Sequence, residues 1–123
     1  MRLLDSNLLI YSAQDEYEFL RSLIRDRQTY LSAASKVETL GYYNLSTNER
    51  LYFEAVFKSA TLLSITDDVV DKAVELRQLK NMSLGDCLIA ATALLNGFSL
   101  YTNNTDDFTH IPGLTVVNPL NEQ

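Results

Sequence analysis

The chain has 123 residues, of which 46% are hydrophobic, and it carries a formal net charge of −6. This size and apolar content predict a single domain, spanning residues 1–123, with a core of its own. The acidic balance argues against a broad basic face for duplex DNA, and no apolar run is long enough to span a bilayer. Asp5 and Asn7 interrupt the apolar N-terminal stretch, which therefore lacks the form of a signal peptide, and we expect a cytoplasmic protein.

The chain contains one cysteine, Cys87, and one histidine, His110. A single cysteine cannot form a disulfide within the chain, in keeping with a reducing compartment. Zinc sites need several cysteine or histidine ligands, so a zinc site is not expected. Any bound metal ion would have to be held by oxygen atoms.

Strands and helices are predicted to alternate along the chain. In chain order we expect strand 2–4, a short helix ending at residue 11, helix 15–27, strand 29–32, helix 33–44, helix 48–59, strand 61–65, helix 67–81, helix 83–96, strand 98–102 and strand 114–117. Such alternation indicates a mostly parallel sheet covered by helices on both faces, which is an α/β fold.

Several helix ends carry recognisable capping residues. Ser6 or Asn7 is expected to cap the first helix, Ser46 or Thr47 the helix at 48–59, and Thr66 the helix at 67–81. Gly97 is expected to end the uncharged helix at 83–96, whose Ala90, Ala91 and Ala93 allow close packing. The apolar stripes predict which side chains face inward: Val37, Leu40 and Tyr43 in one helix, and Val69, Val70, Ala73 and Leu76 in another.

Polar side chains gather where the predicted strands end. Asp5 follows the first strand, and Asn104 and the pair Asp106–Asp107 follow the fourth. Asp86 begins the helix that leads into the fourth strand, and Glu38 lies early in the helix after the second strand. In open α/β sheets, ligands bind outside the carboxyl ends of the strands. If the first and fourth strands are neighbours, these side chains meet at one edge.

Each acid also has an ordinary structural interpretation. Asp5 could cap a helix, Asp86 could interact with a helix dipole, Glu38 could be solvated, and Asp107 could close a turn. Their joint placement favours a site instead, because clustered carboxylates repel one another unless a cation joins them. Oxygen ligands alone select magnesium or manganese, with calcium possible. The chemistry that fits is metal-assisted attack of water on a phosphodiester.

Four motifs resemble one known family. They are LLDSN at residues 3–7, SKVETLGY at 35–42, MSLGDCLIAATAL at 82–94 and LYTNNTDDF at 100–108. Together they resemble the PIN-domain ribonucleases, and in particular the VapC-type toxins of toxin–antitoxin pairs. The resemblance covers nearly the whole chain, since GLTVVNP also resembles the family's last strand. It implies a three-layer α/β/α sandwich around a central, mostly parallel five-stranded sheet.

The resemblance also implies an activity and a set of residues. The family members are endoribonucleases that depend on Mg²⁺ or Mn²⁺. Catalytic and metal-binding roles would fall to four acids: Asp5, Glu38, Asp86 and Asp107. Supporting roles would fall to Ser6, Thr102 and Asn104. Family members differ in the placing of the fourth acid, which corresponds here to Asn104 or Asp107; we favour Asp107, with Asn104 lining the site.

Partners follow from the same resemblance: an RNA substrate, a small antitoxin that blocks the site, and a second copy of the chain in a homodimer. Lys36, Arg77 and Lys80 are candidates for contacts with RNA phosphates, although a solvated surface position is the more common role for such residues. The aromatic helices between Val37 and Phe57 could form an antitoxin groove or simply pack in the core. His110 lies beyond the fourth strand and is not expected to act as a base.

Another class of protein remains open: a PIN-like module that binds RNA or protein without cleaving it. Asn104, where many family members have an acid, is the feature that supports this alternative. Receiver domains and haloacid dehalogenase phosphatases fit less well. A receiver needs a lysine after its last strand and none follows Lys80, while Asp5-Ser6-Asn7 lacks the second acid that the phosphatases need.

Overall fold

The computed structural model describes residues 1–122, so the last residue of the predicted single domain lies outside the described residues. The elements are β1 (Arg2–Leu4), α1 (Ser6–Ser12), η1 (Asp15–Tyr17), α2 (Phe19–Arg25), β2 (Thr29–Ser32), α3 (Ala33–Leu40), α4 (Thr47–Ser59), β3 (Thr61–Leu63), α5 (Asp67–Leu79), α6 (Leu84–Asn96), β4 (Ser99–Tyr101), η2 (Thr105–Asp107), β5 (Val116–Val117) and η3 (Pro119–Glu122). This is the predicted alternation, and it confirms the α/β class.

The strands form one five-stranded sheet in the order β3-β2-β1-β4-β5, and every pair is parallel. The first strand is central: Leu3 lies beside Tyr30 of β2 and beside Leu100 of β4. The first and fourth strands are therefore neighbours, as the convergence of the polar residues requires. The backbone N–H of Asp5 extends this contact by donating to the Tyr101 carbonyl, at 2.9 Å.

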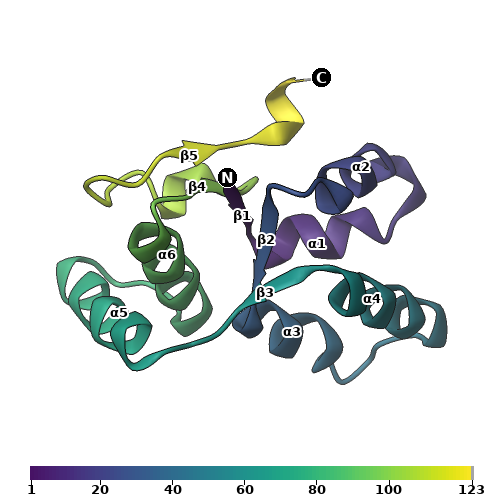
Figure 1. Ribbon diagram of the computed structural model, residues 1–123, viewed down its shortest axis with the longest axis horizontal. Coiled ribbons are helices and arrows are strands. Elements are labelled where there is room, and N and C mark those ends of the chain that lie inside the picture. Colours follow the sequence, from purple (N-terminus) through teal and green to yellow (C-terminus); the bar gives the residue numbers. More distant parts are fainter. Residues whose placement is uncertain (123) are drawn as a thin grey trace.

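Helices cover both faces of the sheet, which gives the predicted three-layer sandwich. In Figure 1, α5 and α6 lie on one side of the strands, and α1, α2 and α4 lie on the other. Successive residues of a strand point to opposite faces. In β1, Leu3 accordingly belongs to the core under α5 and α6, and Leu4 to the core under α1, α2 and α4.

The capping residues explain where several helices begin and end. Ser46 and Glu49 form a reciprocal capping box at the start of α4, and the hydroxyl of Thr66 accepts from the Val69 N–H at the start of α5. Gly97 ends α6 in the left-handed conformation, at φ 68°, where a side chain would be strained. These predictions are confirmed.

The predicted inward face of α3 is only partly correct: Leu40 packs against the core as predicted, whereas Val37 and Tyr43 do not. Val37 is 72% exposed, and the helix ends at Leu40, which leaves Tyr43 in the following loop at 93% exposure. The buried residues of α3 are instead small or polar: Ala34, Ser35 and Thr39. Contacts with α1 and α6 explain this choice, because small side chains allow three helices to approach closely at the end of the sheet.

Two further expectations need correction. Val70 is exposed on α5, although Val69, Ala73 and Leu76 are buried as predicted. The helix expected at residues 15–27 divides into the 3₁₀ helix η1 and the α-helix α2, which flank Glu18, and α2 ends at Arg25. Within residues 1–122, no helix is long and apolar enough to cross a membrane.

Candidate metal centre at the carboxyl edge of the sheet

Asp5 stands at the end of the central strand, and only 4% of its surface is exposed. It occupies the N-cap position of α1, yet its side chain makes no capping hydrogen bond. The carboxylate oxygen Oδ2 instead accepts from the hydroxyl of Thr102, at 2.7 Å, in the residue that follows β4. The carboxylate of Asp5 therefore contacts the residue after the neighbouring strand β4 and does not cap its own helix α1.

The pKa of Asp5 is raised by burial and by neighbouring carboxylates. Burial raises the pKa of this carboxyl from 3.8 to about 6, and the negative charges of Asp86 and Glu38 act in the same direction. The hydroxyl of Thr102 opposes the rise by donating to the carboxylate. Asp5, Asp86 and Glu38, which are far apart in sequence, thus act on one another electrostatically.

Glu38 reaches the same edge from α3. Its Oε1 atom accepts from the hydroxyl of Ser6, at 2.8 Å, and Ser6 lies 2.8 Å from the hydroxyl of Ser35. Ser6 was predicted either to cap α1 or to support the site. The capping prediction is wrong: Asp5 is the N-cap residue, and the Ser6 hydroxyl contacts Glu38 and Ser35.

Asp86 lies in the first turn of α6. The helix starts at a Ser83 cap, whose hydroxyl accepts from the backbone N–H of Asp86 at 3.1 Å. Behind Asp86, the alanines of this helix are fully buried against the sheet, as the close-packing prediction required. Partial burial raises the pKa of the Asp86 carboxyl, and the negative charge of Asp107 raises it further.

The two candidates for the fourth position play different parts. Asp107 is exposed at the end of η2, and it interacts electrostatically with Asp86. Asn104 is half-buried, and its backbone N–H donates to the Thr102 hydroxyl at 3.0 Å, which in turn donates to Asp5. Asp107 thus acts on the Asp86 side of the edge, whereas Asn104 reaches the Asp5 side through its backbone N–H and Thr102.

The basic residues considered for RNA differ in their surroundings. Arg77 donates through Nε to the carbonyl of Met82, at 3.2 Å, and so fixes the connection between α5 and α6. Lys36 and Lys80 are exposed. None of the ion pairs within residues 1–122 involves any of the four acids, so no lysine or arginine neutralises the carboxylates there.

The donor set fits a hard divalent cation. Within the described part of the chain, no three acidic, histidine or cysteine side chains gather tightly enough to form a ready-made metal cage. Repulsion between ionised carboxylates favours such separation. Magnesium is commonly held by one or two carboxylates plus water and substrate oxygens. Asp5 and Asp86 would supply the carboxylate ligands of the cation. Glu38 and Asp107 lie close enough to interact electrostatically with them.

Sequence analysis overlooked Ser35, which is fully buried and bonded to Ser6. It precedes Glu38 by three residues on the same helix, and side chains at this spacing lie on one face. A serine one turn before a candidate ligand was therefore the available signal. The prediction missed it because the apolar stripe through Val37 was used to orient the helix.

Fold and site together define a class of protein: an all-parallel α/β/α domain with a cluster of carboxylates at the carboxyl edge of its sheet. The family model of the PIN domain matches residues 2–114. The chain belongs to the PIN domain family, which confirms the resemblance drawn from the four motifs. A search of the curated proteins finds no match.

Solved structures give the same result for the fold. A chain of a toxin–antitoxin complex from Klebsiella pneumoniae is 30% identical, with a TM-score of 0.77, and the match covers 97% of this chain and 98% of that one. FitAcB from Neisseria gonorrhoeae gives 24% identity, a TM-score of 0.74 and coverage of 98% and 99%. VapBC2 from Rickettsia felis, solved bound to a DNA fragment from its promoter, is 21% identical with a TM-score of 0.77. The match covers 95% of this chain and 97% of that one.

Proposed function

We propose that this protein is a Mg²⁺- or Mn²⁺-dependent endoribonuclease and the toxin of a toxin–antitoxin pair. The observation that carries the proposal is the electrostatic coupling of Asp5, Glu38 and Asp86 at one edge of the sheet, with no cationic side chain paired to them within residues 1–122. Membership of the PIN domain family supports nuclease chemistry at this edge.

The protein's own residues would hold and orient the reacting groups. A bound divalent cation supplies the acidity that activates water and the charge that binds a phosphate oxygen. Thr102 fixes one oxygen of Asp5 and Ser6 fixes one oxygen of Glu38, so both carboxylates have set orientations. Asp86 is carried on the first turn of a buried helix, which limits its movement.

Toxin function is supported by the neighbours, since the Klebsiella pneumoniae match is described as a toxin–antitoxin complex. An antitoxin segment has a suitable groove beside the site. The groove has a volume of about 280 Å³, lies between α1, α3 and α4, and is lined by Ile10, Glu38, Thr39, Tyr42, Leu45, Glu49 and Phe53. Glu38 is therefore shared by the groove and the site, and a partner in the groove would cover a candidate ligand.

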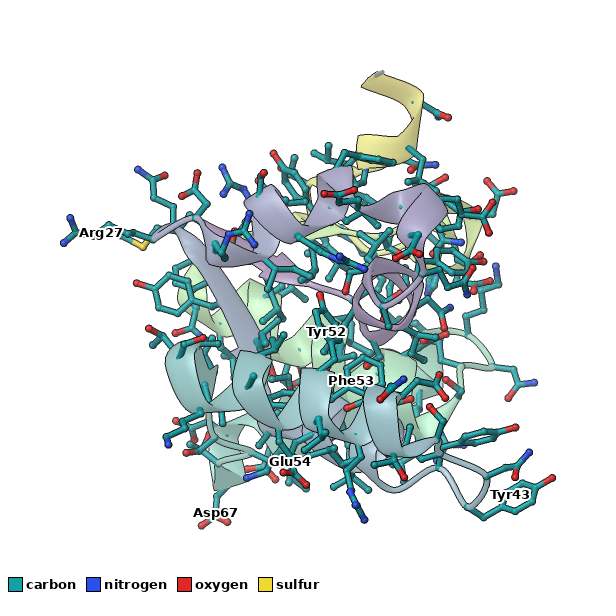
Figure 2. The ribbon with its side chains drawn as sticks, turned by 90° about the vertical axis from the view of Figure 1, so that its right-hand side faces the viewer. Arg27, Tyr43, Tyr52, Phe53, Glu54 and Asp67 are labelled. Atoms are coloured by element: carbon teal, nitrogen blue, oxygen red, sulfur yellow. The ribbon has the colours of Figure 1, made fainter. Side chains whose placement is uncertain are left out.

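Figure 2 distinguishes the aromatic residues near this groove. Phe53 points inward from α4, whereas Tyr43 projects from the loop after α3 into solvent. The core-packing interpretation therefore holds for Phe53, and the exposed Tyr42 lines the groove. A second apolar hollow, which includes the exposed Val37, Ile65 and Leu84, lies on the other side of Glu38 and supports the proposed homodimer.

RNA cleavage tests the proposal directly. The purified chain, freed of any co-purified partner, is incubated with a pool of structured and unstructured RNAs in Mn²⁺, in Mg²⁺ and in excess chelator. We expect cleavage only with metal, and its loss in Asp5→Asn and Asp86→Asn, while Asp106→Asn serves as a matched control at an exposed acid outside the proposed site. Cleavage that persists in chelator, or in both site variants, would refute the proposal.

Two observations favour the alternative of a binding module. No three candidate ligands gather tightly among residues 1–122, and Asn104 contributes an amide where many family members have an acid. Under this alternative the chain retains RNA in a gel-shift assay, cleaves none of the pool, and gives no heat on titration with Mn²⁺. The nuclease proposal requires the opposite result in the cleavage and titration experiments.

A further inference from the structure

Glu38 lies unusually close to the backbone of α6. A Cβ atom added at Gly85 would stand 2.7 Å from Oε2 of Glu38, 3.0 Å from its Cδ and 3.1 Å from its Oε1. Real Cβ atoms essentially never approach other atoms within 3.0 Å, so the Glu38 carboxylate occupies the space that any other residue at position 85 would fill. Gly85 immediately precedes Asp86 in the chain, so the Glu38 carboxylate lies against the turn of α6 that carries a second candidate ligand.

The other side of the Glu38 carboxylate is held by hydroxyl groups in series. Ser6 has one hydroxyl hydrogen, and the carboxylate of Glu38 can only accept, so that hydrogen is used in the 2.8 Å bond to Oε1. In the 2.8 Å contact between Ser6 and Ser35, the donor must then be Ser35. Ser35 is fully buried on α3, one turn before Glu38, and therefore fixes the rotation of the Ser6 hydroxyl.

We propose that Gly85 and Ser35 are positioning residues of the metal centre. Gly85 leaves room for the Glu38 carboxylate against the first turn of α6, and Ser35 orients the hydroxyl that holds its Oε1 atom. This inference rests on the proposed function for its link to metal binding. The placement of the carboxylate itself depends only on the contacts of Glu38, Gly85, Ser6 and Ser35.

The Gly85→Ala substitution should displace the Glu38 carboxylate without disturbing the backbone of α6. The atoms that the new Cβ meets belong to the far end of a flexible side chain, so the carboxylate can move while the backbone stays in place. Alanine is also a better helix former than glycine, so we expect α6 to form in the variant. The Glu38 carboxylate would move away from position 85, and the hydrogen bond from Ser6 to Glu38 would break or lengthen.

The first readout is Mn²⁺ affinity, measured by calorimetry on the metal-stripped full chain. Changes to residues that hold metal ligands typically weaken metal binding about 10- to 100-fold, and we expect Gly85→Ala to fall in this range and Ser35→Ala at its lower end. Leu95→Ala, at the exposed far end of the same helix, is the matched control and should bind like the wild type. Wild-type affinity in Gly85→Ala would overturn the proposal.

A double variant separates steric displacement of Glu38 from other effects of an alanine at position 85. In a Glu38→Ala background there is no carboxylate to displace, so adding Gly85→Ala should leave the Mn²⁺ affinity unchanged. Equal losses from Gly85→Ala in the two backgrounds would show that its effect does not pass through Glu38, and the proposal would fail.

The second readout needs no metal. The side-chain carboxyl ¹³C signal of Glu38 in the metal-free protein should shift in Gly85→Ala and in Ser35→Ala, and should stay in place in Leu95→Ala. If the wild-type chain binds no Mn²⁺, the proposed function fails, while this signal still decides whether Gly85 and Ser35 position Glu38. An unmoved Glu38 signal in both site variants would overturn the inference even if the wild type cleaves RNA.

Discussion

Replacing Asp5 with asparagine is expected to stabilise the metal-free protein at neutral pH. Burial, assisted by the charges of Asp86 and Glu38, raises the Asp5 pKa from 3.8 to about 6. This rise in the Asp5 pKa, from 3.8 to about 6, corresponds to about 3 kcal/mol of unfavourable free energy for the ionised carboxylate in the folded state. Asparagine has a similar shape, can still accept from Thr102, and carries no charge, so it should recover up to this amount.

The direction in which stability changes with pH follows from proton binding by Asp5. The folded protein holds the Asp5 proton more tightly than the unfolded chain, so stability is lost as the pH rises from about 4 to about 6 and stays lost above that. The advantage of Asp5→Asn should therefore be absent below pH 4 and complete above pH 6. For a chain of this length, a gain of about 3 kcal/mol corresponds to a rise of about 10 °C in melting temperature.

The assay is thermal and urea-induced unfolding in chelator, from pH 3.5 to pH 7.5, on the wild type and Asp5→Asn. Asp106→Asn, at an exposed neighbouring acid, is the control and should show no comparable gain. Adding Mn²⁺ should stabilise the wild type and leave Asp5→Asn almost unchanged. An Asp5→Asn variant that is less stable than the wild type at pH 7, or a difference independent of pH, would refute this electrostatic reasoning.

Three further predictions concern single contacts. Thr102→Val removes the hydroxyl that donates to Asp5 and should weaken Mn²⁺ binding about 10- to 100-fold in calorimetry; unchanged affinity would contradict its supporting role. Ser46→Ala removes the capping box of α4 and should lower the free energy of unfolding in urea by about 1 kcal/mol, whereas no loss would mean that the cap is not needed. Ala90→Leu should cost about 1–3 kcal/mol in the same assay because Ala90 is fully buried, and a neutral effect would contradict close packing of α6.

Features with a local signal were predictable from the sequence. Ser46, Thr66 and Gly97 set helix ends through bonds or backbone angles that involve only a few neighbouring residues. The regular alternation of strands and helices predicted a parallel sheet but not its strand order, and the observed order places the end of β1 beside the end of β4. The convergence of Asp5 with Thr102 follows from that topology.

Features that depend on contacts between distant segments were not predictable in the same way. The apolar period through Val37 pointed to the wrong face of α3, because packing against α1 and α6 selects the small residues Ala34 and Ser35 instead. The sequence alone does not mark Gly85 as important. Its importance lies in the short distance between Glu38 and the place that a Cβ atom at position 85 would occupy. Spacing alone also did not decide between Asn104 and Asp107 for the fourth position, although Asp107 was favoured.

The most direct test of the central claim is a crystal of the chain soaked in Mn²⁺, with the anomalous scattering of manganese used to locate the ion. The account predicts a peak bonded to the carboxylates of Asp5 and Asp86, and loss of the peak in Asp86→Asn crystals. A peak elsewhere on the surface, or none at an ion concentration that supports RNA cleavage, would contradict the assignment of this edge of the sheet as the metal centre.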